Sequence, residues 1–287
     1  MQMSVFQMYQ RLNRAGAKLR GIGSYETQLE GTRVHFYAKR GSGDGPPALL
    51  LHGLGADGLT YAKVFSLLAK KLSAVYALDF PGYGFSPLPP SGPLSMEAMV
   101  ALAENFLAKE VQEPVFLFGN SMGGALAAQV AAQNPTQVRA LCLWAPAGAP
   151  MRVEEAEALS KLFEVQNGRQ ARALFRRLFV RAPWYTEWFA PWLVPMFDLP
   201  AVRHTRENDM QRCVEPQTLQ KLHMPTLLVW GALEKLLPPA GVEYFREYLP
   251  KGAVVLEVQG FGHMPHLESP KKCMRIWWEF AQKQGLI

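Results

Sequence analysis

Residues 119–123, with the sequence Gly-Asn-Ser-Met-Gly, are the part of the chain best suited to covalent chemistry. They lie between an apolar run at 114–118 and an Ala-rich stretch at 124–134, a pattern that predicts a strand, a sharp turn and a helix. In that context a G-x-S-x-G turn presents the serine hydroxyl at its tip. The flanking glycines permit the close backbone packing that the turn requires. Ser121 is therefore the predicted nucleophile.

A serine hydroxyl needs a base that takes its proton, and the later part of the chain offers two candidates. His263 lies in a Gly-rich loop after the apolar run at 254–258. Such a loop can bring its histidine to the edge of the sheet where Ser121 is expected, so His263 is the predicted base. His266 is the alternative, although its place at the start of the last helix favours a packing role.

The base in turn needs a carboxylate that orients it. Glu234 follows the apolar run that ends at Trp230, and we predict that it is this carboxylate. The alternative interpretation of Glu234 is an exposed surface pair with Lys235, which would contribute little to stability. Asp79 ends an earlier apolar run, and there a structural carboxylate that accepts hydrogen bonds from loop amides is the preferred interpretation.

Attack on a carbonyl group creates an oxyanion, which needs two backbone N–H donors. The amide of Met122, directly after the nucleophile, is one predicted donor. The amide of Leu54 is the other, because this residue lies between two glycines in the loop at 52–55. His52 is expected to brace this loop.

The elements that must position these residues can be predicted from the apolar pattern. The alternating segment at 32–38 predicts a half-buried strand, which is expected to pair with 25–30 through the turn at Gly31. Unbroken apolar runs suit strands that are buried on both faces of a parallel sheet, and they occur at 48–52, 75–79, 115–118, 138–145, 226–230 and 254–258. Helical segments lie between them, at 61–71, 95–110, 124–134, 239–249 and 270–284. The alternation predicts an α/β fold with a mostly parallel eight-stranded sheet and helices on both faces.

No strand pattern is found between 148 and 217, which predicts a helical cap inserted into this core. Its segment 175–197 is rich in aromatic residues, and these either pack on the core or form an apolar acyl-chain pocket. The candidate substrate contacts in the cap are Phe179, Trp184 and Trp188. We therefore predict an N-terminal helix at 1–24, a core at 25–147 and 218–287, and a cap at 148–217.

Composition limits the class of protein. The 287 residues include 30 Lys and Arg against 24 Asp and Glu, a net charge of +6 that is moderate, and we expect no nucleic-acid partner. No apolar run is long enough for a membrane span, and the first residues lack a secretory signal. The three cysteines are far apart and have no metal-like spacing. We expect reduced thiols in a cytoplasmic protein.

Taken together, five motifs make the chain resemble the α/β-hydrolase serine hydrolases over roughly 45–287. They are His52-Gly-Leu-Gly, Asp79-Phe-Pro-Gly-Tyr-Gly-Phe-Ser, Gly119-Asn-Ser-Met-Gly-Gly, Trp230-Gly-x-x-Glu-x-x-x-Pro and Gly262-His263. The resemblance implies an α/β-hydrolase fold and a Ser-Glu-His triad of Ser121, Glu234 and His263 that needs no metal or cofactor. Most relatives carry Asp where this chain has Glu234. Serine in the turn weighs against the dehalogenase and epoxide-hydrolase branches, which need a carboxylate there.

A basic N-terminal helix followed by a hydrolase with an aromatic cap resembles monoacylglycerol lipases and related membrane-associated esterases. We therefore expect hydrolysis of a carboxylic ester with one medium or long acyl chain. A carbon–carbon bond hydrolase of ring-cleavage products uses the same triad but needs polar groups for a dienoate, such as Asn120. A ligand receptor with little turnover is the remaining alternative.

The stretch 5–18 intersperses apolar residues with cations, as helices at membrane interfaces do. A mitochondrial presequence and a packed helix are its other interpretations. The expected partners are thus a lipid or apolar ester substrate and a membrane surface that the N-terminal helix and the cap contact peripherally. The pattern says nothing of oligomeric state.

Overall fold

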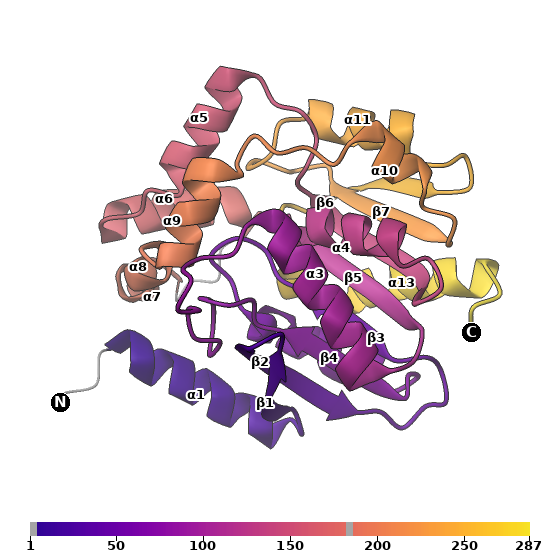
Figure 1. Ribbon diagram of the computed structural model, residues 1–287. Coiled ribbons are helices and arrows are strands. Elements are labelled where there is room, and N and C mark those ends of the chain that lie inside the picture. The colour runs from indigo at the N-terminus through magenta and orange to yellow at the C-terminus, as the bar shows by residue number, and fades with distance from the viewer. Residues whose placement is uncertain (1–4, 182–185) are drawn as a thin grey trace.

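The computed structural model describes residues 5–181 and 186–287 and shows a central sheet between two layers of helices (Figure 1). The sheet has eight strands in the order β1-β2-β4-β3-β5-β6-β7-β8. β1 and β2 form an antiparallel hairpin, β2 is also antiparallel to β4, and the other neighbours are parallel. The strands are β1 (Gly23–Leu29), β2 (Thr32–Arg40), β3 (Ala48–Leu51), β4 (Ala74–Leu78), β5 (Val115–Ser121), β6 (Val138–Pro146), β7 (Thr226–Gly231) and β8 (Val254–Val258). This architecture confirms the predicted fold class.

The apolar runs form the buried middle of the sheet because successive side chains point to opposite faces. In β5, Val115 and Leu117 belong to one hydrophobic cluster, whereas Phe116 and Phe118 belong to another. Both faces are therefore covered, which explains why this run is continuously apolar. The edge strand β1 is instead partly exposed along most of its length.

Helices cover both faces of the sheet. The first face carries α3 (Met96–Phe106), α4 (Met122–Gln133) and α11 (Ala240–Tyr248), and the second carries α2 (Ala62–Leu68) and α13 (Pro270–Lys283). Figure 1 shows α3 and α4 in front of the strands. Short elements complete the core, namely η1 (Gly58–Tyr61), the π-helical turn η2 (Leu107–Val111), α10 (Pro216–Gln220) and α12 (Pro265–Glu268).

Local chemistry sets several boundaries. Glu30 and Gly31 both have positive φ, 47° and 80°, as a two-residue hairpin turn between twisted strands requires. The side chain of Ser95 accepts a hydrogen bond from the amide of Ala98 and caps the start of α3. The same role falls to Asn167 at the start of α6.

The interval 148–217 contains helices and no strand in its described part. They are α5 (Val153–Leu162), α6 (Gly168–Leu178), α7 (Thr186–Phe189), η3 (Ala190–Leu193), α8 (Val194–Phe197) and α9 (Pro200–Asn208), and they lie together beyond one edge of the sheet (Figure 1). The N-terminal helix α1 (Val5–Leu19) packs beside η3 as well as β1. The division of the chain into core and cap remains a prediction.

Candidate active site

Ser121 stands at the junction of β5 and α4, in a backbone conformation that is unusual for a residue with a side chain. Its φ and ψ are 56° and −124°. Neighbouring glycines make the turn sterically feasible: a Cβ on Gly119 would lie 2.2 Å from the carbonyl oxygen of Gly123, and one on Gly123 would lie 2.0 Å from that of Leu51. A strained residue held by close packing on every side is typical of a functional site.

His263 and Glu234 form a buried pair at the same edge of the sheet. The Nδ1 of His263 lies 2.9 Å from Oε2 of Glu234, and both side chains are almost fully shielded from solvent. The other carboxylate oxygen, Oε1, accepts hydrogen bonds from the amides of Leu236 and Leu237 at 2.7 and 3.2 Å. Because the carboxylate engages Nδ1, the Nε2 of His263 is left for a proton acceptor role.

The environment of Glu234 favours its charged form. Burial by itself would raise the pKa of this carboxyl, but the adjacent His263 and the two amide donors outweigh it and hold the pKa below its ordinary value. Glu234 is therefore a carboxylate at neutral pH, as an orienting group must be.

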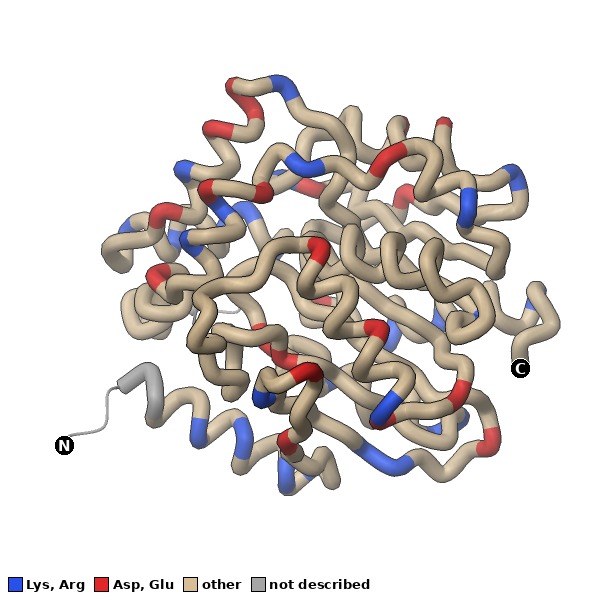
Figure 2. The backbone as a smooth tube through the Cα atoms, in the orientation of Figure 1, with Lys and Arg blue, Asp and Glu red and all other residues tan. Residues whose placement is uncertain are grey.

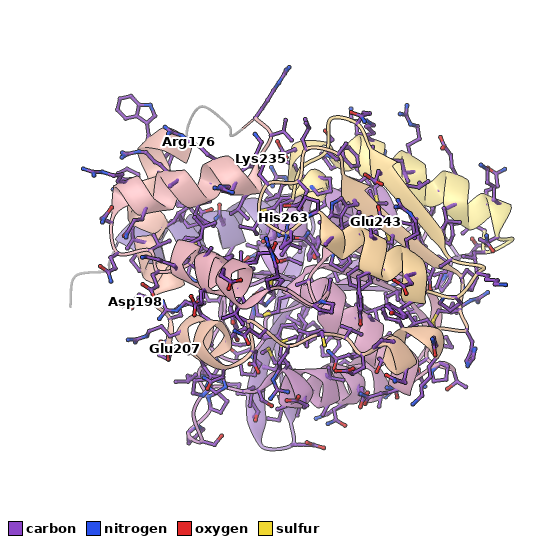
Figure 3. All side chains as sticks on the ribbon, turned by 90° about the horizontal axis from the view of Figure 1, so that it is seen from above. Arg176, Asp198, Glu207, Lys235, Glu243 and His263 are labelled. Atoms are coloured by element: carbon purple, nitrogen blue, oxygen red, sulfur yellow. The ribbon has the colours of Figure 1, made fainter. Side chains whose placement is uncertain are left out.

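Two hydrogen bonds connect the loops that carry these groups. The amide of Leu233 donates to the carbonyl oxygen of Phe261 at 2.9 Å, which joins the Glu234 turn to the His263 loop. The side-chain amide nitrogen of Asn120 donates to the carbonyl oxygen of His263, also at 2.9 Å. The residue before the nucleophile is thus bound to the backbone of the predicted base. Figure 3 shows His263 near the middle of the molecule, between the cap helices and α11, which carries Glu243.

His52 braces the loop that carries the predicted oxyanion donor. Its Nε2 accepts a hydrogen bond from the amide of Phe80 at 3.1 Å, so its Nδ1 carries the proton and donates to the carbonyl oxygen of Gly53 at 2.9 Å. Burial lowers the pKa of this imidazole, which keeps the ring neutral. A Cβ on Gly53 would lie 3.2 Å from Cβ of Ser121, so the loop approaches the predicted nucleophile closely.

Asp79 and His266 have other partners, in line with the sequence-based preference. Asp79 accepts hydrogen bonds from the amides of Gly58 and Phe85 at 2.7 and 3.0 Å, and its Oδ2 lies 2.8 Å from Nδ1 of His35. The sequence had given no sign of His35. The ring of His266 packs against Tyr61 and Trp144, and burial lowers its pKa to about 3.

A cavity of about 740 Å³, including its open mouth, adjoins Ser121, the predicted nucleophile. Ser121, Leu54 and Met122 all line it, so the three groups proposed for attack and oxyanion binding meet at one space. Most of the wall is apolar. Its apolar residues include Leu159 of α5 and the adjacent Phe163, Trp230 of β7, and Leu236 and Leu237 from the turn after β7. A mainly apolar wall of this kind suits an apolar ligand.

The predicted substrate contacts lie elsewhere in the described structure. Phe179 is buried against Phe175 and does not belong to the described cavity wall. Trp188 is 74% exposed on α7, at the outer surface of the cap. Asn120 is buried and its amide nitrogen serves two carbonyl oxygens, those of Trp144 and His263. Trp184 lies outside the described residues.

Three polar residues of the predicted cap line the cavity, although the sequence did not indicate them. Thr205, Asp209 and Arg212, from α9 and the turn that follows it, form a polar part of the wall. Thr205 and Asp209 are four residues apart and therefore share one side of a helix. Their burial beside Ala201 and Val202 is evident only in the folded structure, so no signal for them is present in the sequence.

The described part of the chain has no helix with the length and apolar character of a membrane span. Its His, Cys, Asp and Glu side chains form no cluster of three or more that could hold a metal ion. Cys142, Cys213 and Cys273 are free thiols.

Comparison with known proteins identifies similar chains. The model of a family described as "Alpha/beta hydrolase family" matches residues 48–276. Lipase 1 of Psychrobacter immobilis is 26% identical over 249 residues, which cover 81% of this chain and 76% of the lipase. Monoacylglycerol lipase ABHD6 of Homo sapiens is 26% identical over 267 residues, covering 85% of this chain and 78% of that protein. A solved structure of a membrane phospholipase A, described as a bacterial virulence factor, has a TM-score of 0.83 at 27% identity and covers 98% of this chain and 91% of its own.

Proposed function

The chain is a hydrolase that belongs to the alpha/beta hydrolase family, and on this premise we propose that it cleaves carboxylic esters with one medium or long acyl chain. The cavity is the observation that carries the proposal, because Ser121 adjoins a space with a mainly apolar wall. Such a wall can bury the methylene groups of an acyl chain, at about 0.8 kcal/mol each. The similarity to a lipase and a monoacylglycerol lipase supports the same substrate class.

In the proposed mechanism, Nε2 of His263 takes the proton of Ser121 as its hydroxyl oxygen attacks the ester carbonyl. The amides of Leu54 and Met122 stabilise the oxyanion. His263 then protonates the leaving alcohol, and water hydrolyses the acyl-enzyme by the same route. Glu234 keeps the imidazole oriented and stabilises its positive charge throughout. No step calls for a metal ion or an organic cofactor.

Two contacts favour ester hydrolysis over the carbon–carbon bond hydrolase alternative, which would need a polar group free to hold a carboxylate. Arg212 is an arginine of the cavity wall, but its guanidinium is paired with both Asp209 and Glu97. The amide nitrogen of Asn120 is engaged by backbone carbonyl oxygens. The pairing of Glu234 with His263 likewise favours an enzyme over a receptor, since binding alone does not require it.

Turnover of p-nitrophenyl esters of increasing chain length tests the proposal. We expect the highest kcat/KM at intermediate or long chains, and Ser121→Ala should lower kcat by about 10⁶-fold, as the loss of a catalytic serine does elsewhere. A preference for the acetate ester would contradict the substrate class. Unchanged turnover by Ser121→Ala would contradict the nucleophile.

We further propose that the enzyme works at a lipid surface, which α1 and the cap contact. The apolar residues Met8, Leu12 and Leu19 form a stripe along α1 and are exposed, Leu12 by 64% and Leu19 by 90%. The opposite side of the helix packs on the core through Ala17. An amphipathic helix whose apolar side faces solvent suits a membrane interface better than a packed helix.

Cations and cap aromatics extend this surface. Arg11 and Lys18 flank the apolar stripe, and Figure 2 shows basic residues along α1. α1 packs beside η3, whose Trp192 is about half-exposed, and the neighbouring Trp188 is exposed on α7. Basic and aromatic side chains together are what a bilayer with anionic headgroups would attract.

A further inference from the structure

A second serine, histidine and aspartate are in hydrogen-bond contact outside the cavity that adjoins Ser121. They are Ser24 of β1, His35 of β2 and Asp79, which follows β4. Oγ of Ser24 lies 2.5 Å from Nε2 of His35, and Nδ1 of His35 lies 2.8 Å from Oδ2 of Asp79. These contacts have the order of nucleophile, base and acid in a Ser-His-Asp triad, which is recognised by its geometry and not by the order of its residues along the chain.

The pairing of neighbouring strands brings these three residues together. Ser24 lies opposite Tyr37 in the register of the hairpin, and His35 is two residues from Tyr37, so the side chains of Ser24 and His35 are diagonal neighbours on one face. β4 is the next strand in the sheet (Figure 1), and the amide of Asp79 donates to the carbonyl oxygen of His35 at 3.0 Å. The three groups are therefore held by the sheet itself.

The other partners of Asp79 determine where the proton of His35 lies. The carboxylate accepts hydrogen bonds from the amides of Gly58 and Phe85, at 2.7 Å on Oδ1 and 3.0 Å on Oδ2, so both of its oxygens act as acceptors. In the neutral ring, Nδ1 of His35 therefore carries the proton and donates to Asp79, which leaves the lone pair of Nε2 directed at Ser24. The hydroxyl of Ser24 donates to Nε2, and this is the contact that activates a serine for attack.

The nucleophile of this group is accessible, whereas its base and acid are shielded. The side chains of His35 and Asp79 are 1% and 0% exposed. The rings of Tyr37 and Phe85 pack against the imidazole, with centroids 4.6 and 5.3 Å from that of His35. Ser24 itself is partly exposed on the edge strand β1. A small molecule can thus approach the hydroxyl while water is kept from the base.

We propose that Ser24 is a second acylation site of this protein, which takes the acyl group of small activated esters such as aryl acetates. Oγ of Ser24 forms a bond to the carbonyl carbon, and Nε2 of His35 takes the hydroxyl proton. The bond between this carbon and the aryl oxygen then breaks, and the phenolate leaves with the electron pair. His35 releases its proton to solvent, so the products are O-acyl Ser24, a phenolate and one proton. An aryl ester is the suitable class because a phenolate leaves without a proton from the base. The inference does not depend on the proposed function of Ser121.

The test uses the whole chain with Ser121→Ala, which removes the predicted active-site nucleophile, and p-nitrophenyl acetate as the acyl donor. Samples are quenched with acid at short times, digested and mapped by mass spectrometry. Ser42 is the internal control, because it is exposed and its hydroxyl donates to the carbonyl oxygen of Ala69. We expect Ser24 to gain an acetyl group about 100-fold faster than Ser42, the lower end of what a positioned base contributes.

Two further measurements separate activation by His35 from simple exposure. His35→Gln, added to Ser121→Ala, should slow acetylation of Ser24 by about 100-fold and leave Ser42 unchanged. Unfolding in urea should bring the rate at Ser24 to that at Ser42, because only the folded sheet places His35 beside Ser24. If His35→Gln does not fold, the comparison of folded and urea-unfolded protein decides.

Three outcomes would overturn the inference. They are equal acetylation of Ser24 and Ser42 in the folded protein, a rate at Ser24 that neither His35→Gln nor urea lowers, and an acetyl group that fragmentation places on the exposed Tyr25 instead. Failure of the proposed function is distinguishable from all three. It would appear in the turnover of long-chain esters, whereas this test reads the position of the acetyl group.

Discussion

The side-chain amide nitrogen of Asn120 lies 2.9 Å from the carbonyl oxygen of His263 and 2.8 Å from that of Trp144. One buried amide thus connects the strand that carries the predicted nucleophile, the neighbouring strand and the loop of the predicted base. We therefore expect the position of His263 relative to Ser121 to depend on this amide as well as on Glu234. Asn120 therefore acts by holding the backbone around the predicted base and does not contact the substrate.

Replacing Asn120 by Ala should accordingly damage both folding and catalysis. Two buried carbonyl oxygens lose their donor, which should lower the free energy of unfolding by about 1–3 kcal/mol. The kcat should fall as well, because His263 is less well positioned. Urea unfolding and ester turnover below the melting range measure the two effects. Asn134→Ala is the matched control, since it removes a hydrogen bond to Glu104 away from the cavity. Equal kcat values in the two variants would contradict a positioning role.

The predicted triad makes a graded prediction for kcat. Glu234→Ala should lower kcat by about 10⁴-fold, and His263→Ala by about 10⁶-fold, because an orienting acid contributes less than the base itself. The amides of Leu236 and Leu237 also lose their acceptor, Oε1, in the Glu234 variant. Ester turnover at pH 7 to 8 gives the ranking, with Glu243→Ala, an exposed surface carboxylate, as a control. Full activity in Glu234→Ala would remove this residue from the mechanism.

The parts of this site that could be predicted from sequence are those with local steric or topological causes. The turn at Ser121 requires glycine at 119 and 123, because a Cβ there would collide with backbone. Glu234 and His263 follow strands β7 and β8, and the carboxyl ends of adjacent parallel strands meet at one edge. These constraints determine which residue types can occur and at what spacing, so they can be recognised in the sequence.

The residues that line the cavity could not be recognised in the sequence in this way. Asp209 lies in the cavity wall because of how the chain folds after α9, and its ion-pair partner Arg212 also pairs with Glu97 of the distant helix α3. Trp188 has the composition of a pocket residue but lies on the outer side of the cap. An amphipathic pattern predicts that one side of a helix is covered and says nothing of which neighbour covers it.

His266 should make stability depend on pH. Its pKa in the folded protein is about 3, far below the value of 6.5 in an unfolded chain, so the unfolded state binds the proton more readily. Its contribution is present above pH 6.5 and is lost as the pH falls toward 3. The free energy of unfolding should thus fall by up to about 1.4 kcal/mol per pH unit below 6.5 from this group.

Urea unfolding between pH 7 and pH 4.5 measures that slope. His266→Leu should show a smaller slope than the unmodified protein, whatever its stability at pH 7, and His52 should supply a remaining part because burial lowers its pKa too. The exposed His223, replaced by Leu, is the control and should leave the slope unchanged. Identical slopes in all three proteins would show that His266 does not remain neutral in the folded state.

The exposed stripe of α1 predicts binding to lipid vesicles. Leu12 is 64% exposed in the middle of the stripe, so Leu12→Asp places a charge where the proposed contact lies and should reduce co-sedimentation with anionic vesicles several-fold. Asn13→Asp adds the same charge to the neighbouring exposed position outside the stripe and should reduce it less. Binding should also weaken as salt rises, because Arg11 and Lys18 act through a screened attraction to the headgroups. Equal binding by both variants, or no binding even at low salt, would reject the proposed surface. As a control, the unmodified protein and the two variants should hydrolyse a dispersed short-chain ester at the same rate.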